Sequence, residues 1–362
     1  MRVPSIVVSL TCLIGAAGCA RPVRVATVDV SSQRCRAVES APQALRWTAP
    51  ADDKQRTRLD RWCAAVGPPL LRSSPTPDAG IDGVTIVAWN VHVGQADIHR
   101  LIGDLRASGT KAQTRAIVLL LQEAKRTGGD VPRRAPRGAR MAARIGPATG
   151  EARPFDIQTV ARELDWSLVY VPSMRNGEPP VEATAADDRG AAILSSIPLT
   201  APHAIELPVE RQRRVAITAR LAHRTSAGLP WSLDVVSVHL ENRPGPGRGW
   251  FRAAAARTRQ VEALLSALAS AKTAGTGVVD DVPVVMGGDL NTWRGSREGA
   301  LRLLRRAFPR GGSDVRPTFR RFRLDYLLGR LPDSVSITQR RLDDAYGSDH
   351  YPVVAEIDFG RQ

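Results

Sequence analysis

Residues 284–292 have the sequence VVMGGDLNT, which combines a short apolar run with glycines and polar residues. It begins with three apolar residues, continues with Gly287 and Gly288, and then places Asp289 and Asn291 after the glycines. A short apolar run of this kind predicts a buried strand. Polar groups that terminate buried strands at one edge of a sheet converge on a common cleft, which is the default position of an active site. We therefore expect Asp289 and Asn291 to lie in such a cleft.

Other apolar runs in the chain also end in polar side chains. They place Asn90 after residues 86–89, Glu123 after 117–122, His239 after 235–238, Asp325 within 324–326, and Asp349 with His350 before 351–353. Each feature alone has a structural interpretation. A Gln-Glu pair after a strand is typical of a helix start, a Ser-Asp-His turn is typical of a cap, and a histidine at a strand end is usually a satisfied structural residue. Only the combination indicates one site.

From residue 84 onward, short β-rich runs alternate with helical stretches. The predicted strands are 84–89, 116–121, 167–171, 191–195, 214–222, 231–239, 282–286, 324–328 and 351–357, and the predicted helices are 96–107, 157–164, 253–271 and 296–308. Alternation of apolar and polar residues over 215–221 favours antiparallel neighbours with one covered face. Strands outnumber helices by about two to one, which fits two packed sheets with helices on the outer faces.

The N-terminus has the order of a secretory signal. Met1-Arg2 precedes the apolar run 3–17, and Gly18-Cys19 follows it. Residues 16–19 resemble a bacterial lipobox, so residues 1–19 are predicted to be a signal peptide whose Cys19 carries a lipid anchor. An ordinary signal peptide or an uncleaved anchor are the alternatives. All of them predict an exported protein, either a periplasmic or outer-envelope lipoprotein or a secreted one.

Residues 20–80 are polar and rich in proline, which predicts a tether with a small N-terminal segment before a domain at 81–362. Of the four cysteines, Cys12 and Cys19 belong to the leader. In an oxidising compartment the remaining pair, Cys35 and Cys63, predicts a disulfide worth about 3–4 kcal/mol. Two separate buried thiols are the alternative.

The net charge of +15 comes mainly from arginine, which supplies 47 of the 51 basic residues. A basic surface attracts nucleic acid and anionic lipid headgroups alike, so the charge permits either substrate and selects neither. Two stretches without apolar periodicity, 125–153 and 243–252, are predicted surface loops. Substrate contact and compositional drift explain their arginines equally well.

In this order, the motifs resemble the endonuclease/exonuclease/phosphatase superfamily, which includes pancreatic-type deoxyribonuclease, abasic-site endonucleases, inositol-polyphosphate phosphatases and neutral sphingomyelinases. The matching segments are residues 89–92, 121–123, 189–195, 237–240, 287–292, 324–326 and 348–353. The resemblance covers residues 84–358. It implies a deoxyribonuclease-I-like fold, a four-layer α/β/β/α sandwich of two mixed, mostly antiparallel sheets. It implies hydrolysis of phosphate esters, but this fold hosts different substrates.

Hydrolysis of a phosphate ester requires charge neutralisation, an oriented water and a stabilised leaving group. Glu123 is a hard oxygen donor suited to Mg²⁺ or Mn²⁺, and Asn90 can either hold that carboxylate or complete the polar shell of the metal. Asp289 is the candidate general base, a role worth roughly 10²–10⁴ in rate. Asn291 can place its amide on a phosphate oxygen.

The resemblance adds three roles. It implies that His350 donates to the phosphate oxygens while Asp325 fixes its tautomer and favours its charged form. It places Asp349 beside the metal or the leaving group, and it matches His239 to the family's second catalytic histidine or to the tyrosine that replaces it. In deoxyribonuclease-like members that histidine has a carboxylate partner, for which Glu178, Asp187 and Asp188 are open candidates. His92 departs from the family pattern, and Arg189 is either a phosphate contact or a solvated loop residue.

The sequence thus predicts a metal-dependent phosphodiesterase or nuclease, monomeric and acting outside the cytoplasm on a phosphate-ester substrate. A phospholipid-headgroup hydrolase of the sphingomyelinase or inositol-phosphatase type is the alternative, and a long exposed hydrophobic hairpin near the cleft would favour it. A third hypothesis is an inactive binding lipoprotein. Loss of Glu123, Asp289 or His350 would indicate that protein, and all three are present.

Overall fold

The structure is a computed structural model of the 362-residue chain. It describes residues 25–27, 45–108, 114–145, 155–181, 183–242, 249–273, 282–314 and 316–359. The predicted signal peptide and lipobox, Cys35, and parts of both predicted loops lie outside these ranges. Within the described ranges, no helix has the length and apolar character needed to cross a membrane.

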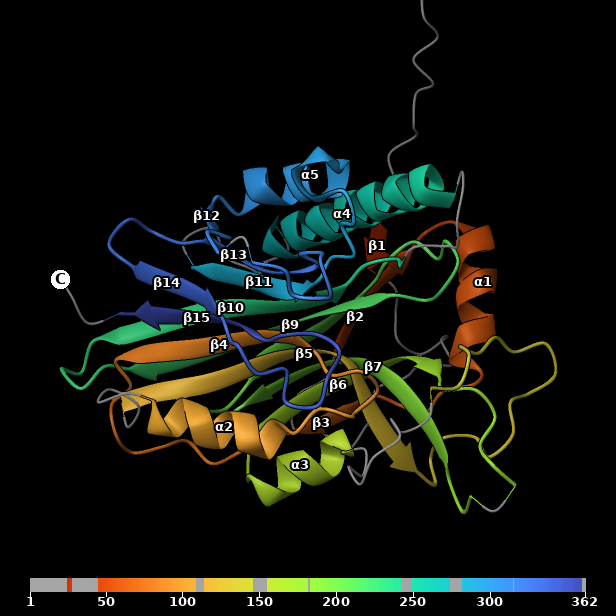
Figure 1. Cartoon of the computed structure of the whole chain (residues 1–362), viewed down its shortest axis with the longest axis horizontal. Coiled ribbons are helices and arrows are strands. Elements are labelled where there is room, and N and C mark those ends of the chain that lie inside the picture. The colour runs from red at the N-terminus through yellow and green to blue at the C-terminus, as the bar shows by residue number, and fades with distance from the viewer. Residues whose placement is uncertain are drawn as a thin grey trace, which may run out of the picture.

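Two sheets form the centre of the molecule (Figure 1). The first has the strand order β1-β2-β8-β9-β10-β11-β13-β12, and the second has the order β14-β15-β4-β5-β7-β6-β3. In the first sheet the strands are β1 (Val25–Thr27), β2 (Arg46–Pro50), β8 (Thr200–Glu206), β9 (Val215–Arg224), β10 (Pro230–His239), β11 (Val284–Asp289), β12 (Arg310–Gly311) and β13 (Asp325–Arg330). In the second they are β3 (Leu70–Arg72), β4 (Gly83–Asn90), β5 (Arg115–Gly128), β6 (Ser167–Arg175), β7 (Ala186–Ser195), β14 (Ser336–Arg341) and β15 (Val353–Asp358).

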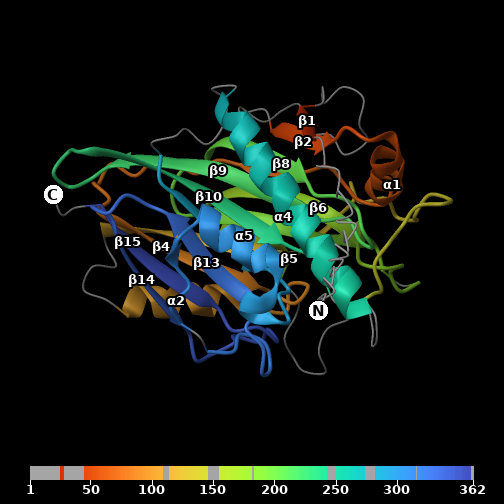
Figure 2. The ribbon, with the colours of Figure 1, turned by 90° about the horizontal axis from the view of Figure 1, so that it is seen from above.

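Helices cover the outer face of each sheet, which gives the predicted α/β/β/α sandwich. Helices α4 (Gly249–Thr273) and α5 (Gly299–Ala307) lie over the first sheet, while α2 (Ile98–Ala107) and α3 (Ile157–Glu163) lie under the second (Figure 1). Figure 2 shows α4 running across the strands of the first sheet. Both sheets are mixed and mostly antiparallel, and β4–β5, β10–β11 and β2–β8 are the parallel pairs among the described strands.

The period of two along each strand divides the apolar side chains between cores. In β4, Ile86 and Ala88 face the central core between the sheets. Val87 and Trp89 face the outer core, which lies between the second sheet and helices α2 and α3. In β10, Val235 faces the central core. Its neighbours on the other face pack beneath α4 and α5. Strands buried on both faces explain the nearly continuous apolar runs in the sequence.

Aspartates begin the two helices beneath the second sheet. Asp97 accepts a hydrogen bond from the backbone nitrogen of Arg100 at the start of α2, and Asp156 accepts one from Thr159 at the start of α3. Each bond satisfies one of the backbone donors that a first helical turn leaves free. The predicted helices 96–107 and 157–164 are confirmed to within two residues at each end.

The N-terminal boundary predicted at residue 81 is wrong for part of the chain. β2 pairs with β8, β3 pairs with β6, and α1 (Asp53–Cys63) lies between β2 and β3 in sequence. Buried Leu59 and Trp62 of α1 belong to the central core. The domain therefore extends back into the predicted N-terminal segment, because β2 joins the first sheet and β3 forms an edge of the second. Cys63 is disulfide-bonded, and Cys35 lies outside the described residues.

The predicted end of the strand at Glu123 is also wrong. β5 continues to Gly128, and its pairing with β7 shifts register between Leu121 and Ala124. A β-bulge adds a residue to one strand and redirects a side chain without ending the ladder. Glu123 has φ = 55° at this bulge, which takes its side chain out of the regular alternation. The first part of the predicted loop 125–153 is consequently strand.

Candidate active site

Strand register brings the predicted polar residues to one edge of each sheet. In the first sheet His239 is aligned with Asp289 across β10 and β11, and Asp289 is aligned with Asp325 across β11 and β13. In the second sheet Asn90 is aligned with Gln122 across β4 and β5. The two edges face a shared cavity. The prediction that polar strand ends converge is therefore confirmed.

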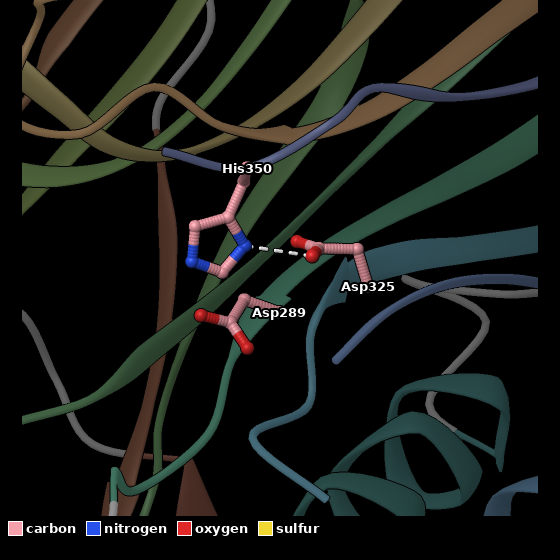
Figure 3. A group of neighbouring side chains, drawn as sticks. All are labelled: Asp289, Asp325 and His350. Carbon is pink, nitrogen blue, oxygen red and sulfur yellow. Dashed lines mark hydrogen bonds and ion pairs between the residues drawn. The ribbon is translucent and has the colours of Figure 1, made fainter. Parts of the chain in front are cut away.

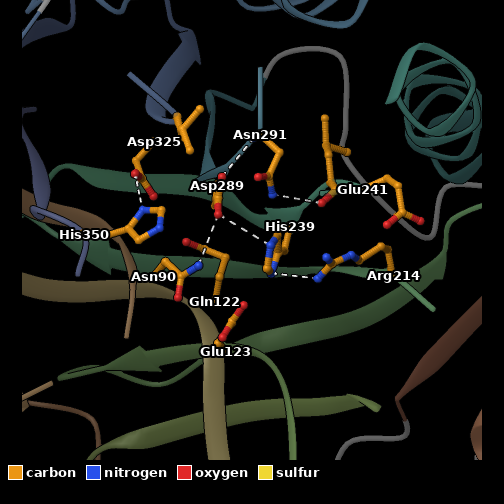
Figure 4. Close-up of polar contacts among 12 residues, drawn as sticks. Asn90, Gln122, Glu123, Arg214, His239, Glu241, Asp289, Asn291, Asp325 and His350 are labelled. Carbon is orange, nitrogen blue, oxygen red and sulfur yellow. Dashed lines mark hydrogen bonds and ion pairs between the residues drawn. The ribbon is translucent and has the colours of Figure 1, made fainter. Parts of the chain in front are cut away.

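The cavity has a volume of about 180 Å³. Its lining consists of Asn90, His92, Glu123, Ile145, His239, Asn242, Asp289, Asn291, Trp293, Phe319, Leu324, Asp349 and His350. Seven of the eight predicted site residues are in this set, and the eighth, Asp325, lies behind His350 (Figure 4). Ile145 is the contribution of the arginine-rich stretch that follows β5.

Asp289 occupies the centre of the polar network. Its Oδ2 accepts a hydrogen bond of 3.1 Å from the amide of Asn90, and its Oδ1 accepts one of 2.9 Å from the backbone nitrogen of Asn291 (Figure 4). Burial and the neighbouring Asp325 raise the pKa of Asp289 to about 7. A carboxylate with a pKa near neutrality is matched to general-base work at physiological pH.

Close strand packing fixes the position of Asp289. Gly288 has φ = 156°, and a β-carbon built on it would lie 1.8 Å from the carbonyl oxygen of Val238 on β10. Only glycine permits this approach of β11 to β10. On the other side of Asp289, Asn291 adopts φ = 49°, a left-handed conformation that asparagine tolerates better than most residues. Its amide donates to the carbonyl oxygen of Leu240 at 3.2 Å.

His350 and Asp325 form a buried pair (Figure 3). Nδ1 of His350 lies 2.7 Å from Oδ2 of Asp325, so the ring donates from Nδ1 and directs Nε2 toward the cavity. Burial lowers the pKa of His350, but Asp325, Asp289 and Asp349 outweigh it and raise the pKa to about 10. His350 is therefore an imidazolium at neutral pH, suited to neutralising charge on a phosphate.

His239 has an arginine as its partner. Nη1 of Arg214 lies 3.0 Å from Nδ1 of His239, and Nε2 of the same ring lies 3.5 Å from Oδ2 of Asp289. Arginine has no acceptor, so Nδ1 of His239 must accept and Nε2 must carry the proton. Burial first, and then the charge of Arg214, hold the pKa of His239 well below its usual value. His239 is thus a neutral donor aimed at Asp289.

The three carboxylates considered as partners of His239 are engaged elsewhere. Asp188 accepts from Tyr170 and pairs with Arg126, Asp187 pairs with Arg144, and Glu178 pairs with Arg175. None of these three carboxylates is therefore the partner of His239, whose ring lies between Arg214 and Asp289. The tertiary structure explains this outcome. The two aspartates of β7 form ion pairs with Arg126 and Arg144, and Arg214, next to the start of β9, contacts His239 instead.

Glu123 and Asp349 present carboxylate oxygens to the cavity. The side chain of Glu123 is 21% exposed, and its Oε2 lies 3.7 Å from Nη1 of Arg189. Asp349 is 43% exposed, with Oδ1 placed 3.6 Å from Nδ1 of His92 and 4.0 Å from Nε2 of His350. Both positions leave carboxylate oxygens accessible from the cavity, as a metal-ligating role requires.

The donor set fits a hard divalent cation. Asn90, Glu123 and Asp349 offer oxygen atoms to one cavity, and Oδ1 of Asp325 is buried without a hydrogen-bond partner in the described part of the chain. Ligand atoms of Asp289, Asp325 and His350 also lie within 4.8 Å of one another (Figure 3). A cation among these three would compete with His350 for Asp325, so the first set is the better metal position.

Arg214, Trp293 and Phe319 are site residues that sequence reasoning missed. Arg214 belongs to no motif and reaches His239 only through the pairing of β9 with β10. Phe319 and Trp293 line the cavity, and the Phe319 ring lies 4.7 Å from the ring of His350. The position of Trp293 at the cavity could have been predicted from the sequence, because Trp293 follows the predicted site residue Asn291 by two residues. No local signal marked Phe319.

Residues 87–350 match the model of the Endonuclease/Exonuclease/phosphatase family. Among solved structures, the chain is similar to TDP2 from C. elegans, with 15% identity, a TM-score of 0.40 and coverage of 78% of this chain and 77% of that one. It is also similar to sphingomyelinase C from Streptomyces griseocarneus, with 18% identity, a TM-score of 0.42, and coverage of 76% and 99%. A family protein from Leptotrichia buccalis gives 13% identity, a TM-score of 0.46, and coverage of 76% and 100%.

No curated protein sequence matches this chain significantly. The family model nevertheless spans most of the chain, and it includes every predicted site residue from Asn90 to His350. This chain belongs to the Endonuclease/Exonuclease/phosphatase family.

Proposed function

We propose that this protein is a Mg²⁺- or Mn²⁺-dependent phosphodiesterase that acts on nucleic acid outside the cytoplasm. Members of its family are phosphoesterases. The observation that supports catalysis best is the placement of Asp289, with a pKa of about 7, beside the imidazolium of His350 in one cavity. A base and a cation at one site are what attack of water on a phosphate ester requires.

Asp289 orients the attacking water and accepts its proton. Nε2 of the neutral His239 is directed toward Asp289 and restricts the orientation of its carboxylate. His350 holds its charge against the phosphate oxygens, and Asp325 keeps that charge and ring orientation in place. Asn291 contributes an amide that also lines the cavity.

Asn90, Glu123 and Asp349 would hold the metal ion. When bound, such an ion supplies Lewis-acid stabilisation of charge on the phosphate and leaving group. The cluster of carboxylates around Asp289 favours a cation, because like charges in a buried site repel one another. Dependence of hydrolysis on a divalent cation would therefore distinguish an active enzyme from an inactive binding protein.

A phospholipid-headgroup hydrolase is the second candidate function. It is favoured by the proposed envelope location and by the lipid anchor that we infer at Cys19. Among the described residues, the two exposed large apolar side chains are Val181 and Leu229, and neither lines the cavity. The described part of the chain thus offers no hydrophobic hairpin beside the site, and we therefore prefer nucleic acid as the substrate.

A substrate panel tests the proposal. Purified protein is incubated with plasmid DNA, RNA, sphingomyelin and inositol phosphates, each with Mg²⁺ and with EDTA. We expect Mg²⁺-dependent cleavage of DNA or RNA. Cleavage of sphingomyelin alone would favour the second candidate, and no cleavage of any substrate would favour an inactive binding protein.

Export is tested separately by mass spectrometry of the mature protein. We expect the N-terminus at Cys19 with a lipid modification and no free thiol at Cys35 or Cys63. An intact Met1 on envelope-localised protein would contradict cleavage, and two alkylatable cysteines without reductant would contradict the Cys35–Cys63 pairing. We propose that the protein is a monomer, which sedimentation analysis of the mature form would check.

A further inference from the structure

A tight turn carries two arginines beside the catalytic pair. The backbone nitrogens of Phe319 and Phe322 donate to each other's carbonyl oxygens at 2.9 Å and 2.8 Å, which closes a loop with Arg320 and Arg321 at its tip. Arg320 has φ = 49°, as reversal over two residues requires. We call residues 319–322 the Phe319–Phe322 turn. The hydrogen bonds of the turn fix the backbone positions from which the two arginine side chains extend.

The two tip arginines are exposed, and their charges are not neutralised by described residues. Arg320 lies over the ring of Phe319 at 5.4 Å, and Arg321 lies over the ring of Phe322 at 5.2 Å. Neither forms an ion pair within the ranges that the structure covers. By contrast, the nearby Arg316 pairs with both Asp314 and Asp343. The rings restrain the guanidinium groups while their N–H donors remain available.

The turn is attached directly to the catalytic pair. Oγ1 of Thr318 accepts the backbone N–H of Asp325 at 3.0 Å, and the carbonyl oxygen of Thr318 accepts that of Tyr351 at 2.8 Å. The ring of Phe319 lies 4.7 Å from the ring of His350 and lines the cavity. Arg320 therefore lies one aromatic ring beyond His350. Arg321 lies over Phe322, whose ring is 5.0 Å from the ring of Trp293 at the cavity.

We propose that the Phe319–Phe322 turn is a docking surface for a nucleic-acid strand, with Arg320 and Arg321 binding phosphates that flank the scissile one. This inference rests on the proposed function, because it names how the substrate of that site is held. A strand presents a series of phosphates to two fixed cations, which a single lipid headgroup does not. A turn that inserts into a membrane would have apolar residues at its tip, and this tip is Arg-Arg.

Binding is measured without turnover, by fluorescence anisotropy of a labelled single-stranded oligodeoxynucleotide in EDTA over a series of salt concentrations. Each phosphate contact on a single strand contributes roughly 0.7 to the slope of log K against log salt. We expect the slope to fall by about 1.4 in Arg320→Gln/Arg321→Gln, with at least a roughly tenfold loss of affinity at low salt. The conservative variant Arg320→Lys/Arg321→Lys should keep most of the slope.

The matched control removes the same charge away from the cavity. Arg162 on α3 and Arg330 at the far end of β13 from Asp325 are both exposed. Arg162→Gln/Arg330→Gln should leave the slope near that of the parent. An equal fall in slope in this control would show that net charge alone attracts the strand, and it would overturn the proposal. Unmeasurable binding by the parent would overturn it too.

Two further measurements separate this inference from the proposed function. The small diester bis(p-nitrophenyl) phosphate has one phosphate and none that flanks it, so Arg320→Gln/Arg321→Gln should hydrolyse it at the parental rate. If the parent hydrolysed neither this diester nor DNA, the proposed function would be refuted. A salt slope that depends on Arg320 and Arg321 would still support docking in that case. Flotation with phosphatidylserine-containing vesicles provides the last test. Vesicle binding that depends on the tip, with oligonucleotide binding that does not, would overturn docking in favour of a membrane surface.

Discussion

Arg214 donates from Nη1 to Nδ1 of His239 over 3.0 Å, and this bond decides what the histidine can do. A carboxylate in the same place would accept from Nδ1 and favour an imidazolium. Arginine does the opposite: it requires an unprotonated Nδ1 and repels charge on the ring. His239 and His350 therefore lie in one cavity with opposite states, the first neutral and the second charged.

The first prediction tests this relationship. Arg214→Met removes the donor to Nδ1, so both neutral tautomers of His239 become available and its pKa rises. We expect a fall in kcat of roughly tenfold or more, the scale of other hydrogen bonds that support a site histidine. Nitrogen-15 NMR of the histidine rings reports the tautomer directly. Arg214→Lys retains a donor and should restore much of the signature. An unchanged His239 spectrum in Arg214→Met would show that the bond does not set the tautomer.

The second prediction concerns the catalytic base and the charged histidine. Asp289→Asn removes the base and should lower kcat by roughly 10²–10⁴, and His350→Ala should remove nearly all turnover. Asp289 lies at the cavity rather than in the apolar core, so the thermal transition should remain largely in place in Asp289→Asn. His350→Ala also removes the buried partner of Asp325, so its transition should stay cooperative but move to lower temperature. Steady-state kinetics and differential scanning calorimetry check the two statements. Turnover within a few-fold of the parent would refute the assigned roles, and a collapse of folding would indicate structural residues instead.

The third prediction is the alkaline limb of the pH profile. His350 has its folded pKa raised from 6.5 to about 10. Its stabilising contribution is therefore complete below the unfolded value and lost as pH rises through about 10. Activity that needs the imidazolium should fall over the same range. Asp325→Asn removes the main group that raises this pKa, so the alkaline limb should move to lower pH. If the alkaline limb stayed at the same pH in Asp325→Asn, the limb would have to be assigned to a group other than His350.

The fourth prediction concerns the metal. EDTA should abolish hydrolysis, and Mg²⁺ or Mn²⁺ should restore it. Glu123→Gln keeps the shape of the side chain but removes a charge that faces the cavity, so it should raise the Mg²⁺ concentration needed for half-maximal activity or prevent rescue. Titration of activity with Mg²⁺ measures this requirement. Full activity in EDTA, or the same Mg²⁺ dependence in the variant, would leave Glu123 as a structural residue at the bulge of β5.

The fifth prediction uses two glycines with opposite surroundings. Gly288→Ala would place a methyl group 1.8 Å from the carbonyl oxygen of Val238, so we expect about 3 kcal/mol of destabilisation and loss of activity through displacement of Asp289. Gly103 in α2 has no neighbour within 4 Å of an added β-carbon and is exposed. Gly103→Ala should stabilise the protein by about 0.5–1 kcal/mol, because alanine favours helix. Urea denaturation of both variants tests the pair.

The fold class and the convergence of the polar strand ends could be predicted from the sequence. Apolar runs that end in Asn90, His239 and Asp289 predict strands whose polar ends meet, and the structure places these residues at one cavity. Such a prediction succeeds because the strand period and the polar residue at its end are both local properties of the chain. The aspartates that begin α2 and α3 are local signals of the same kind.

The hydrogen-bond partners and protonation states of these residues depend on the tertiary structure. Whether a carboxylate or Arg214 contacts His239 depends on how β9 pairs with β10, and whether Asp289 is isolated or lies beside Asp325 depends on the register of β11 with β13. The inclusion of β2 in the first sheet and of β3 in the second was likewise set by long-range pairing. Pairing joins residues far apart in the chain, and burial then sets their pKa values, so neither can be deduced from neighbours in sequence.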